Sequence, residues 1–266
     1  MIKGLYTSWT GMLNEQNRMD ILSNNLANSS TVGYKKEGTT VHPFSAELAV
    51  KIRDASTLNY ADRLGHINMG VKIGENYVDY AQGPFDVTDN MTDVAIGGDG
   101  FFAIEYTNKQ GETSVKYTRD GQFKINTDGY LVTMDGDYVL NQAGALAGQA
   151  GRGNYIQVDP NQEIVIDKLG NILQNDVIVA QLGVIDIQNY DYLERFGENM
   201  FNLLDGGVIV DSNAQVEQGV LEQSNVETVK EMVELITITR AYESSQKVIQ
   251  TIDNMTDKAV NQVGKV

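Results

Sequence analysis

The sequence predicts an α+β protein in which long helices at both ends of the chain pair as a coiled-coil-like domain and flank an antiparallel β-rich middle. Apolar residues recur at seven-residue spacing near both ends, whereas the middle holds short apolar runs separated by Asp-Gly and Gly-Gly turns. We expect an N-terminal helix over residues 1–34, an extended connector with little structure of its own over 35–75, a β-rich domain over 76–220, and a C-terminal helix over 221–266. The two helices together form the expected helical core domain.

The N-terminal helix is predicted from an apolar seam between Ile2 and Leu26. Tyr6 and Leu13 widen the seam on one side. The residues of the seam that we expect to make an assembly interface are Leu5, Trp9, Met12, Met19 and Leu26. A polar run rich in turn formers follows, and Gly33 is expected there with a positive φ angle. We expect Asn24, Asn25 and Asn28 to end the helix and to make side-chain hydrogen bonds there.

The C-terminal helix is predicted to begin at a capping box, with Ser224 as the N-cap and Glu227 reaching back to it. Neither glycine nor proline interrupts the chain from there until Gly264. The seam residues expected to oppose those of the first helix are Leu235, Ile238, Tyr242, Ile249 and Ile252. Val229, Met232, Val233 and Ile236 add a second apolar face to its first turns. A helix of about 40 residues is expected to pack against another element along its length.

The middle is predicted to be β-structure because Gly-centred turns punctuate it. Examples are Asp120-Gly121, Asp128-Gly129 and Asp135-Gly136, each flanked by short apolar runs. The string Gly97-Gly98-Asp99-Gly100 precedes an aromatic run, Phe101-Phe102, instead of a helix, so we interpret it as a turn and not as a nucleotide-binding loop.

The composition excludes several classes of function. The net charge is −16, and residues 39–223 hold 11 basic and 27 acidic residues, so the basic surface that nucleic acid requires is absent. The chain contains no cysteine, which excludes disulfides, thiol catalysis and cysteine-ligated metals. No stretch approaches the roughly 20 apolar residues of a membrane span. The first residues lack the apolar core of a secretory signal, so export through the general secretory route is not supported.

A search for catalytic motifs yields no candidate. His42 and His66 have no metal-type spacing, and the chain has neither a Gly-x-Ser-x-Gly elbow nor a Walker-type phosphate loop. We therefore expect no enzyme activity, no catalytic, cofactor-binding or metal-binding residues, and no small-molecule substrate.

Several motifs together resemble those of one bacterial family. The N-terminal run Leu22–Lys35 is rich in asparagine and small residues and ends in Gly-Tyr-Lys. The segments Gly219–Val226 and Arg240–Glu243 carry the C-terminal part of the resemblance, and Asp93–Phe102 and Tyr117–Gly121 carry the part in the β domain. These motifs are similar to those of the flagellar rod and hook axial proteins, and the chain length is most similar to that of basal-body rod proteins of the FlgF/FlgG type.

The resemblance implies a structural subunit of the flagellar basal-body rod that self-assembles into a helical tube and transmits torque in motility. Its implied partners are copies of itself, other rod and hook axial proteins, and the type III export apparatus. The choice between the proximal and the distal rod stays open. The alternative from another class is a secreted β-rich surface-binding or carbohydrate-acting protein, in which the terminal helices form an ordinary intramolecular hairpin.

Overall fold

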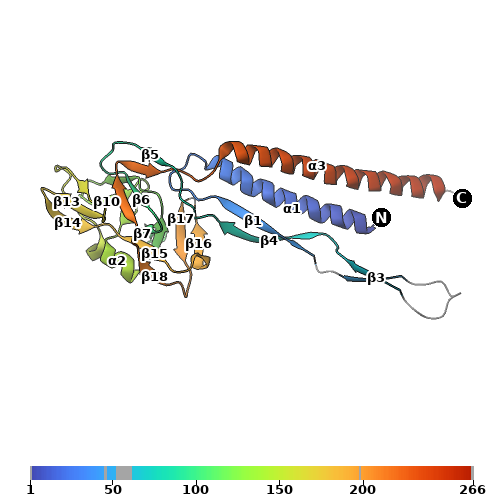
Figure 1. Cartoon of the computed structure of the whole chain (residues 1–266), viewed down its shortest axis with the longest axis horizontal. Coiled ribbons are helices and arrows are strands. Elements are labelled where there is room, and N and C mark those ends of the chain that lie inside the picture. The colour runs from blue at the N-terminus through green and yellow to red at the C-terminus, as the bar shows by residue number, and fades with distance from the viewer. Residues whose placement is uncertain (1, 45–46, 52–61, 198, 265–266) are drawn as a thin grey trace. The chain divides into compact units, whose positions relative to one another are not determined.

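The computed structural model describes residues 2–44, 47–51, 62–197 and 199–264 (Figure 1). The fold is α+β, with a helix at each end of the chain and a β-rich middle, which confirms the predicted class. The chain divides into two compact units. A helical unit comprises Met1–Ala27, Glu37–Asp79 and Glu227–Val266, and a β unit comprises Asn28–Lys36 and Tyr80–Val226. No described helix is long and apolar enough to span a membrane.

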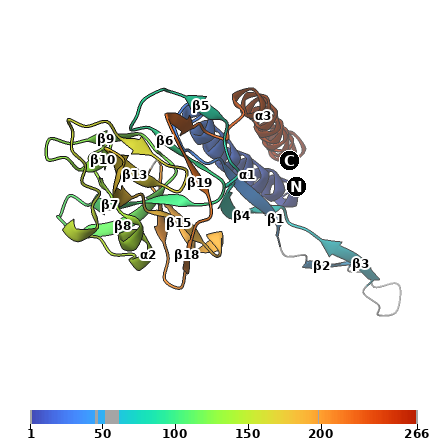
Figure 2. The same ribbon diagram turned by 60° about the vertical axis from the view of Figure 1, so that its left-hand side comes forward.

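The helical unit is built on two antiparallel helices, α1 (Ile2–Ala27) and α3 (Thr228–Lys258) (Figures 1 and 2). A π-helical turn, η3 (Ala259–Val263), extends α3. The two helices are joined by an ion pair between Arg18 and Glu234, with 3.1 Å from Nη2 to Oε1. Nearer the start of α1, Gly4 faces the side chain of Ile252 on α3, where a β-carbon would lie 3.5 Å from Ile252 Cδ1, an ordinary van der Waals distance.

The start of α3 differs from the predicted capping box. The helix begins at Thr228 with Glu227 as its N-cap, and the Glu227 side chain makes no capping hydrogen bond. Ser224 lies four residues before the helix, and its hydroxyl accepts a hydrogen bond from the backbone N–H of Val226. The capping-box prediction is therefore wrong, because Ser224 closes a local turn in the extended segment before the helix.

Much of the segment 35–75, expected as a connector, lies in two antiparallel strand pairs. β1 (Glu37–Pro43) pairs with β4 (Val71–Val78), and β2 (Glu47–Lys51) pairs with β3 (Asp62–Ile67). The expectation of little structure is wrong here, although part of the connector lies outside the described residues. α1 contacts both β1 and β4, and in Figure 1 it lies between this β1–β4 ribbon and α3.

The β unit contains one large sheet and several small ones among its described residues. Nine strands form the large sheet, in which β16-β17-β8-β7-β11-β10-β9 are successive neighbours and β15 joins β7 to β18. Its strands are β7 (Phe101–Thr107), β8 (Thr113–Thr118), β9 (Phe123–Ile125), β10 (Leu131–Thr133), β11 (Tyr138–Val139), β15 (Val184–Ile187), β16 (Leu193–Phe196), β17 (Met200–Leu203) and β18 (Ile209–Asp211). The pairs are antiparallel, as predicted.

The smaller sheets are a three-stranded β12-β13-β14 meander and the pairs β6–β19 and β5–β20. Their strands are β5 (Phe85–Val87), β6 (Val94–Gly97), β12 (Val165–Ile166), β13 (Asn171–Gln174), β14 (Val177–Gln181), β19 (Gln215–Gln218) and β20 (Val220–Glu222). Short helices, α2 (Gln142–Ala147), η1 (Arg152–Asn154) and η2 (Tyr190–Tyr192), complete the unit. The sheets enclose one apolar core, in which Phe102 packs edge-on against Phe123.

Two of the predicted Asp-Gly turns join paired strands, and one does not. Gly129 and Gly136 have positive φ and lie in the β9–β10 and β10–β11 turns. The segment Asp120-Gly121 lies between β8 and β9, which are not neighbours in the sheet. Gly121 has no positive φ, and a β-carbon there would lie 1.6 Å from the carbonyl oxygen of Val94. This glycine permits a close backbone approach, so its assignment to a hairpin turn is wrong.

Candidate functional site

The N-terminal run Leu22–Lys35, which we call the N-terminal signature, extends beyond the first helix. Its part after α1 belongs to the β unit, which includes residues 28–36. Gly33 has φ +67°, as its sequence context predicted. Its N–H donates to the carbonyl oxygen of Glu222 at 2.7 Å. A β-carbon at this position would lie 2.5 Å from the backbone of Arg119. Glycine is therefore required both for the left-handed turn and for the close approach, and the turn directs the next two side chains into the unit.

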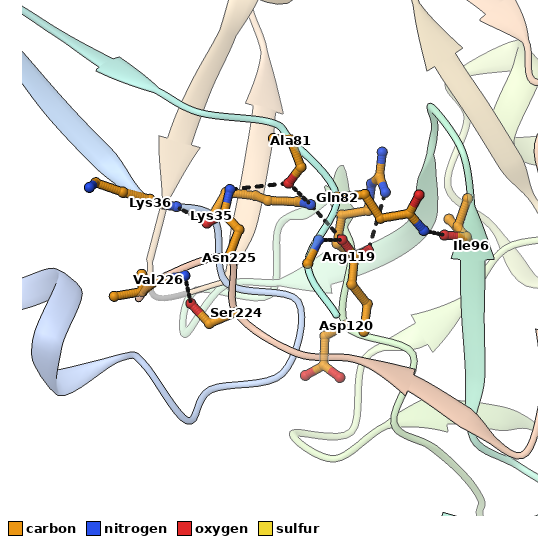
Figure 3. A network of polar contacts seen from close by, with 12 residues as sticks. Lys35, Lys36, Ala81, Gln82, Ile96, Arg119, Asp120, Ser224, Asn225 and Val226 are labelled. Carbon is orange, nitrogen blue, oxygen red and sulfur yellow. Dashed lines mark hydrogen bonds and ion pairs between the residues drawn. The ribbon is translucent and has the colours of Figure 1, made fainter. Parts of the chain in front are cut away.

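Those side chains reach a buried charge cluster, shown around Lys35 and Arg119 in Figure 3. The Lys35 ammonium lies 2.6 Å from Glu222 Oε1, and Arg119 Nη1 lies 3.2 Å from Glu222 Oε2. All three side chains are about 1% exposed. Burial of charge costs free energy unless the charge is paired and hydrogen-bonded, and these distances provide both conditions. We call this Lys35–Glu222–Arg119 cluster the buried triad.

Backbone groups complete the triad's hydrogen bonding. The N–H of Gly83 donates to Glu222 Oε1 at 2.9 Å, and Lys35 Nζ donates to the carbonyl oxygen of Ala81 at 2.9 Å. The same Ala81 oxygen accepts from Asn225 Nδ2 at 3.1 Å, while Asn225 Oδ1 accepts from the N–H of Lys36 at 2.8 Å (Figure 3). The segments before α3 and after α1 are thus held to each other and to the segment that leads into β5.

Tyr34, the residue before Lys35, is also buried in the β unit and is 1% exposed. The Arg195 guanidinium lies 4.4 Å from the centre of its ring and donates to its hydroxyl at 3.2 Å. Asn199 donates its side-chain N–H to the carbonyl oxygen of Val32. Cation–π and hydrogen-bond contacts from β16 and the β16–β17 turn therefore hold the signature on a second side.

Asp120 is a buried carboxyl group of this region whose pKa is clearly displaced. Burial raises its pKa to about 6, and a hydrogen bond from the N–H of Gln122 and the nearby Asn199 amide partly oppose that rise. Among the described residues no group of three His, Cys, Asp or Glu side chains is placed to hold a metal ion. The chemistry available at this site is charge pairing that joins distant parts of the chain.

The asparagines of the signature divide between the helix and the turn after it. Asn24 and Asn25 lie within α1, which ends at Ala27, so the expectation that they end the helix is wrong. Asn25 is fully buried and makes a double hydrogen bond with the backbone of Glu37, accepting from its N–H at 2.9 Å and donating to its carbonyl at 2.8 Å. It joins α1 to β1. Asn28 follows the helix and accepts from the Thr31 hydroxyl at 3.2 Å, which is the kind of local turn bond that its type predicted.

The predicted seam residues occupy different environments. Ile238 is 2% exposed, whereas Leu5 and Trp9 are exposed at 41% and 49%. The remaining members are half-buried: Met12, Met19, Leu26, Leu235, Tyr242, Ile249 and Ile252. The helical unit also exposes large apolar side chains outside the seam, namely Tyr6, Leu13, Val229, Met232, Val233 and Ile236. Whether any of them contacts another copy stays a prediction.

The buried triad was not singled out from the sequence. Its partners are separated by 187 residues (Lys35 and Glu222) and 103 residues (Arg119 and Glu222), so no local pattern connects them. One signal was available, because each of the three lies inside a motif that carried the family resemblance.

Comparison with known proteins assigns the family. The flagellar basal-body rod protein FlgF of Caulobacter vibrioides is 31% identical to this chain over 268 residues, covering 100% of both chains. The chain belongs to the flagellar basal-body rod protein family. FlgG of Borreliella burgdorferi is 32% identical over 98% of each chain, and the hook-basal body complex protein FlhO of Bacillus subtilis is 30% identical over 100% of each.

Three family descriptions match separate parts of this rod-family chain. Residues 5–35 match "Flagella basal body rod protein", residues 95–185 match "Flagellar hook protein FlgE/F/G D1 domain", and residues 217–263 match "Flagellar basal body rod FlgEFG protein C-terminal". Each matched segment contributes one member of the buried triad: Lys35, Arg119 and Glu222, respectively. The triad therefore joins the three parts by which the rod family is recognised.

Proposed function

We propose that this chain is a structural subunit of the flagellar basal-body rod, located in the basal body. Copies associate through the helical unit into a helical tube that transmits torque in motility. The relatives above support this role, because the alignments extend over nearly the whole of each chain and their names place them in the rod or the hook-basal body complex. None of these relatives favours the alternative of a secreted surface-binding or carbohydrate-acting protein.

The observation that carries the assembly proposal is the set of exposed apolar side chains on the helical unit. Trp9 on α1 is 49% exposed, and Val229 and Val233 on α3 are 74% and 60% exposed. Full burial of one such side chain stabilises by about 1.5–3 kcal/mol. Contiguous apolar surface of this kind marks interaction sites in soluble proteins. Association of helical units removes this apolar surface from water.

Within each copy, α1 and α3 pair as a coiled coil. The seven-residue spacing of the seam, the antiparallel course of the helices and the burial of Ile238 support this packing. Within the β unit, the buried triad and the bonds of Asn225 hold the segment before α3 to the segment after α1. Other rod and hook axial proteins are the further partners, and export proceeds through the flagellar type III apparatus.

A matched pair of α3 variants tests the assembly role in cells. Ile236 and Gln246 are both exposed positions of α3, and only Ile236 belongs to its apolar face. We expect Ile236→Glu to abolish motility and rod assembly when it replaces the native protein, because a carboxylate would be buried between copies. Gln246→Glu introduces the same charge outside that face and should support normal motility. Normal motility and intact rods in the Ile236→Glu strain would contradict the proposal.

A further inference from the structure

Two separate apolar faces lie on the helical unit. The α1 face consists of Leu5, Tyr6, Trp9 and Leu13, which are 41–49% exposed. The α3 face consists of Val229, Met232, Val233 and Ile236, which are 50–74% exposed. At 3.6 residues per turn, each set falls within an arc of about 100° of its helix. Each is therefore a continuous stripe, and the two stripes are made by different residues.

The α3 face borders a groove between the two helices. Its volume is about 600 Å³, and its apolar lining includes Val229, Val233, Ile238 and Ala241. Arg18 lies in the same groove and is held by Glu15 at 3.2 Å and by Glu234 at 3.1 Å. Pockets of about 300–1,000 Å³ bury drug-sized groups, so the groove has room for an indole ring and a neighbouring leucine.

The two faces lie at different heights along the helix pair. The ion pair between Arg18 and Glu234 sets Arg18 level with the α3 face. Trp9 lies nine residues earlier on α1, so at 1.5 Å per residue the centre of the α1 face is displaced by about 14 Å along the axis. When a copy uses its α1 face on one neighbour and its α3 face on another, the contact is heterologous and staggered. Heterologous contacts extend into an open helical array when the rotation between copies does not close a ring.

Charge supports a second copy as the occupant of the groove. The groove lining contains Glu15, Glu227 and Glu234 against Arg18 and Lys230, which leaves one acidic residue in excess. Residues 2–14 of α1 carry one charged side chain, Lys3, and no carboxylate. Docking of this segment brings a positive charge and no carboxylate to a groove whose lining is net negative.

We propose that the α1 face of one copy docks into the α3 groove of the next copy, with the Trp9 indole as the central anchor. This inference rests on the proposed rod function and names the two complementary surfaces that build the tube. Tryptophan anchors in desolvated pockets dominate the energetics of many interfaces.

The heterologous arrangement can be tested with two variants that each lose one surface. Trp9→Ala removes the anchor and leaves the α3 groove intact, whereas Val233→Asp blocks the groove and leaves the α1 face intact. Each variant alone should self-associate at least about 30-fold more weakly than the native chain in sedimentation equilibrium, because each lacks one half of the contact. An equimolar mixture should form a one-to-one complex that grows no further.

Tryptophan fluorescence reports the contact directly, because Trp9 is the single tryptophan of the chain. In the mixture only the Val233→Asp copy carries it, so its emission should shift to shorter wavelength when the Trp9→Ala copy is added. Circular dichroism of each variant checks that the helices are intact. An unshifted emission with no one-to-one complex would overturn the pairing of these two faces. If the native chain nevertheless assembles and supports motility, the rod function stands and a different surface joins the copies.

Discussion

Replacing the Glu222 carboxylate with a neutral amide should lower the unfolding free energy of the β unit more than a change at a nearby surface residue does. The substitution Glu222→Gln keeps the shape of the side chain but removes the carboxylate that pairs with the buried side chains of both Lys35 and Arg119. Removing one partner of a buried ion pair costs about 3–5 kcal/mol. Since domains unfold with a free energy of about 5–15 kcal/mol, this change should remove about a fifth or more of the stability of the unit.

The assay is urea unfolding of the full chain followed by near-ultraviolet circular dichroism of tyrosines such as Tyr34 and Tyr117, which are buried in the β unit. Trp9 fluorescence follows the helical unit in the same samples. Glu217→Gln is the matched control, because Glu217 is an exposed carboxylate on β19 and its loss should change stability by no more than about 0.5 kcal/mol.

A second variant tests whether the loss of one cation costs less stability than the loss of the shared carboxylate. Lys35→Met removes one cation and leaves the Glu222–Arg119 ion pair in place, so its cost should be smaller than that of Glu222→Gln, at about 1–3 kcal/mol. The reasoning would be refuted if Glu222→Gln unfolded at the same urea concentration as Glu217→Gln, or if Lys35→Met were the more damaging change.

Three other predictions concern single positions. Gly33→Ala should destabilise the β unit by more than about 1–3 kcal/mol, because the methyl group adds a 2.5 Å clash to the backbone strain of φ +67°. Gly111→Ala is the control, because Gly111 has φ +86° and open space around it. In the same urea titration it should show the cost of the backbone strain alone. Because burial raises the pKa of Asp120 to about 6, the folded protein keeps this carboxyl protonated to a higher pH than the unfolded chain does. The unfolding free energy should therefore fall by about 2 kcal/mol as the pH rises from 4 to 7. Asp120→Asn should flatten that dependence and raise the stability at pH 7; an unchanged pH profile would contradict the assignment. Asn25→Ala should remove both side-chain hydrogen bonds to the backbone of Glu37, so hydrogen exchange at β1 should accelerate while the β unit keeps its protection.

The helical ends and the antiparallel middle could be predicted because their signals are local. The seven-residue seam is visible within any two or three turns of α1, and the turns at Gly129 and Gly136 follow from a residue type that tolerates positive φ. The β1–β4 ribbon escaped prediction for the opposite reason. Its strands pair across a long separation, Glu37 with Val78, and most of their positions are not buried, so neither alternates clearly between apolar and polar residues.

The start of α3 shows how tertiary contacts override a local signal. Ser224 and Glu227 have the spacing of a capping box, yet Ser224 is 5% exposed and belongs to the extended segment beside the buried triad. The hydrogen bonds of Asn225 to Lys36 and Ala81 hold that segment extended, so the helix begins later. A capping preference of about 1 kcal/mol is outweighed by these long-range bonds.

The sequence by itself determined the α+β class, the two terminal helices, the positive φ of Gly33 and the family resemblance, because periodicity, turn chemistry and motifs are properties of neighbouring residues. Only the tertiary structure decided that the N-terminal signature lies within the β unit, that Asn25 fastens α1 to β1, and that Lys35, Arg119 and Glu222 form one buried cluster. The physical reason is distance along the chain: a charge is stable in the interior only beside its counterion, and which residue supplies that counterion is settled when segments separated by 100 residues or more are folded together.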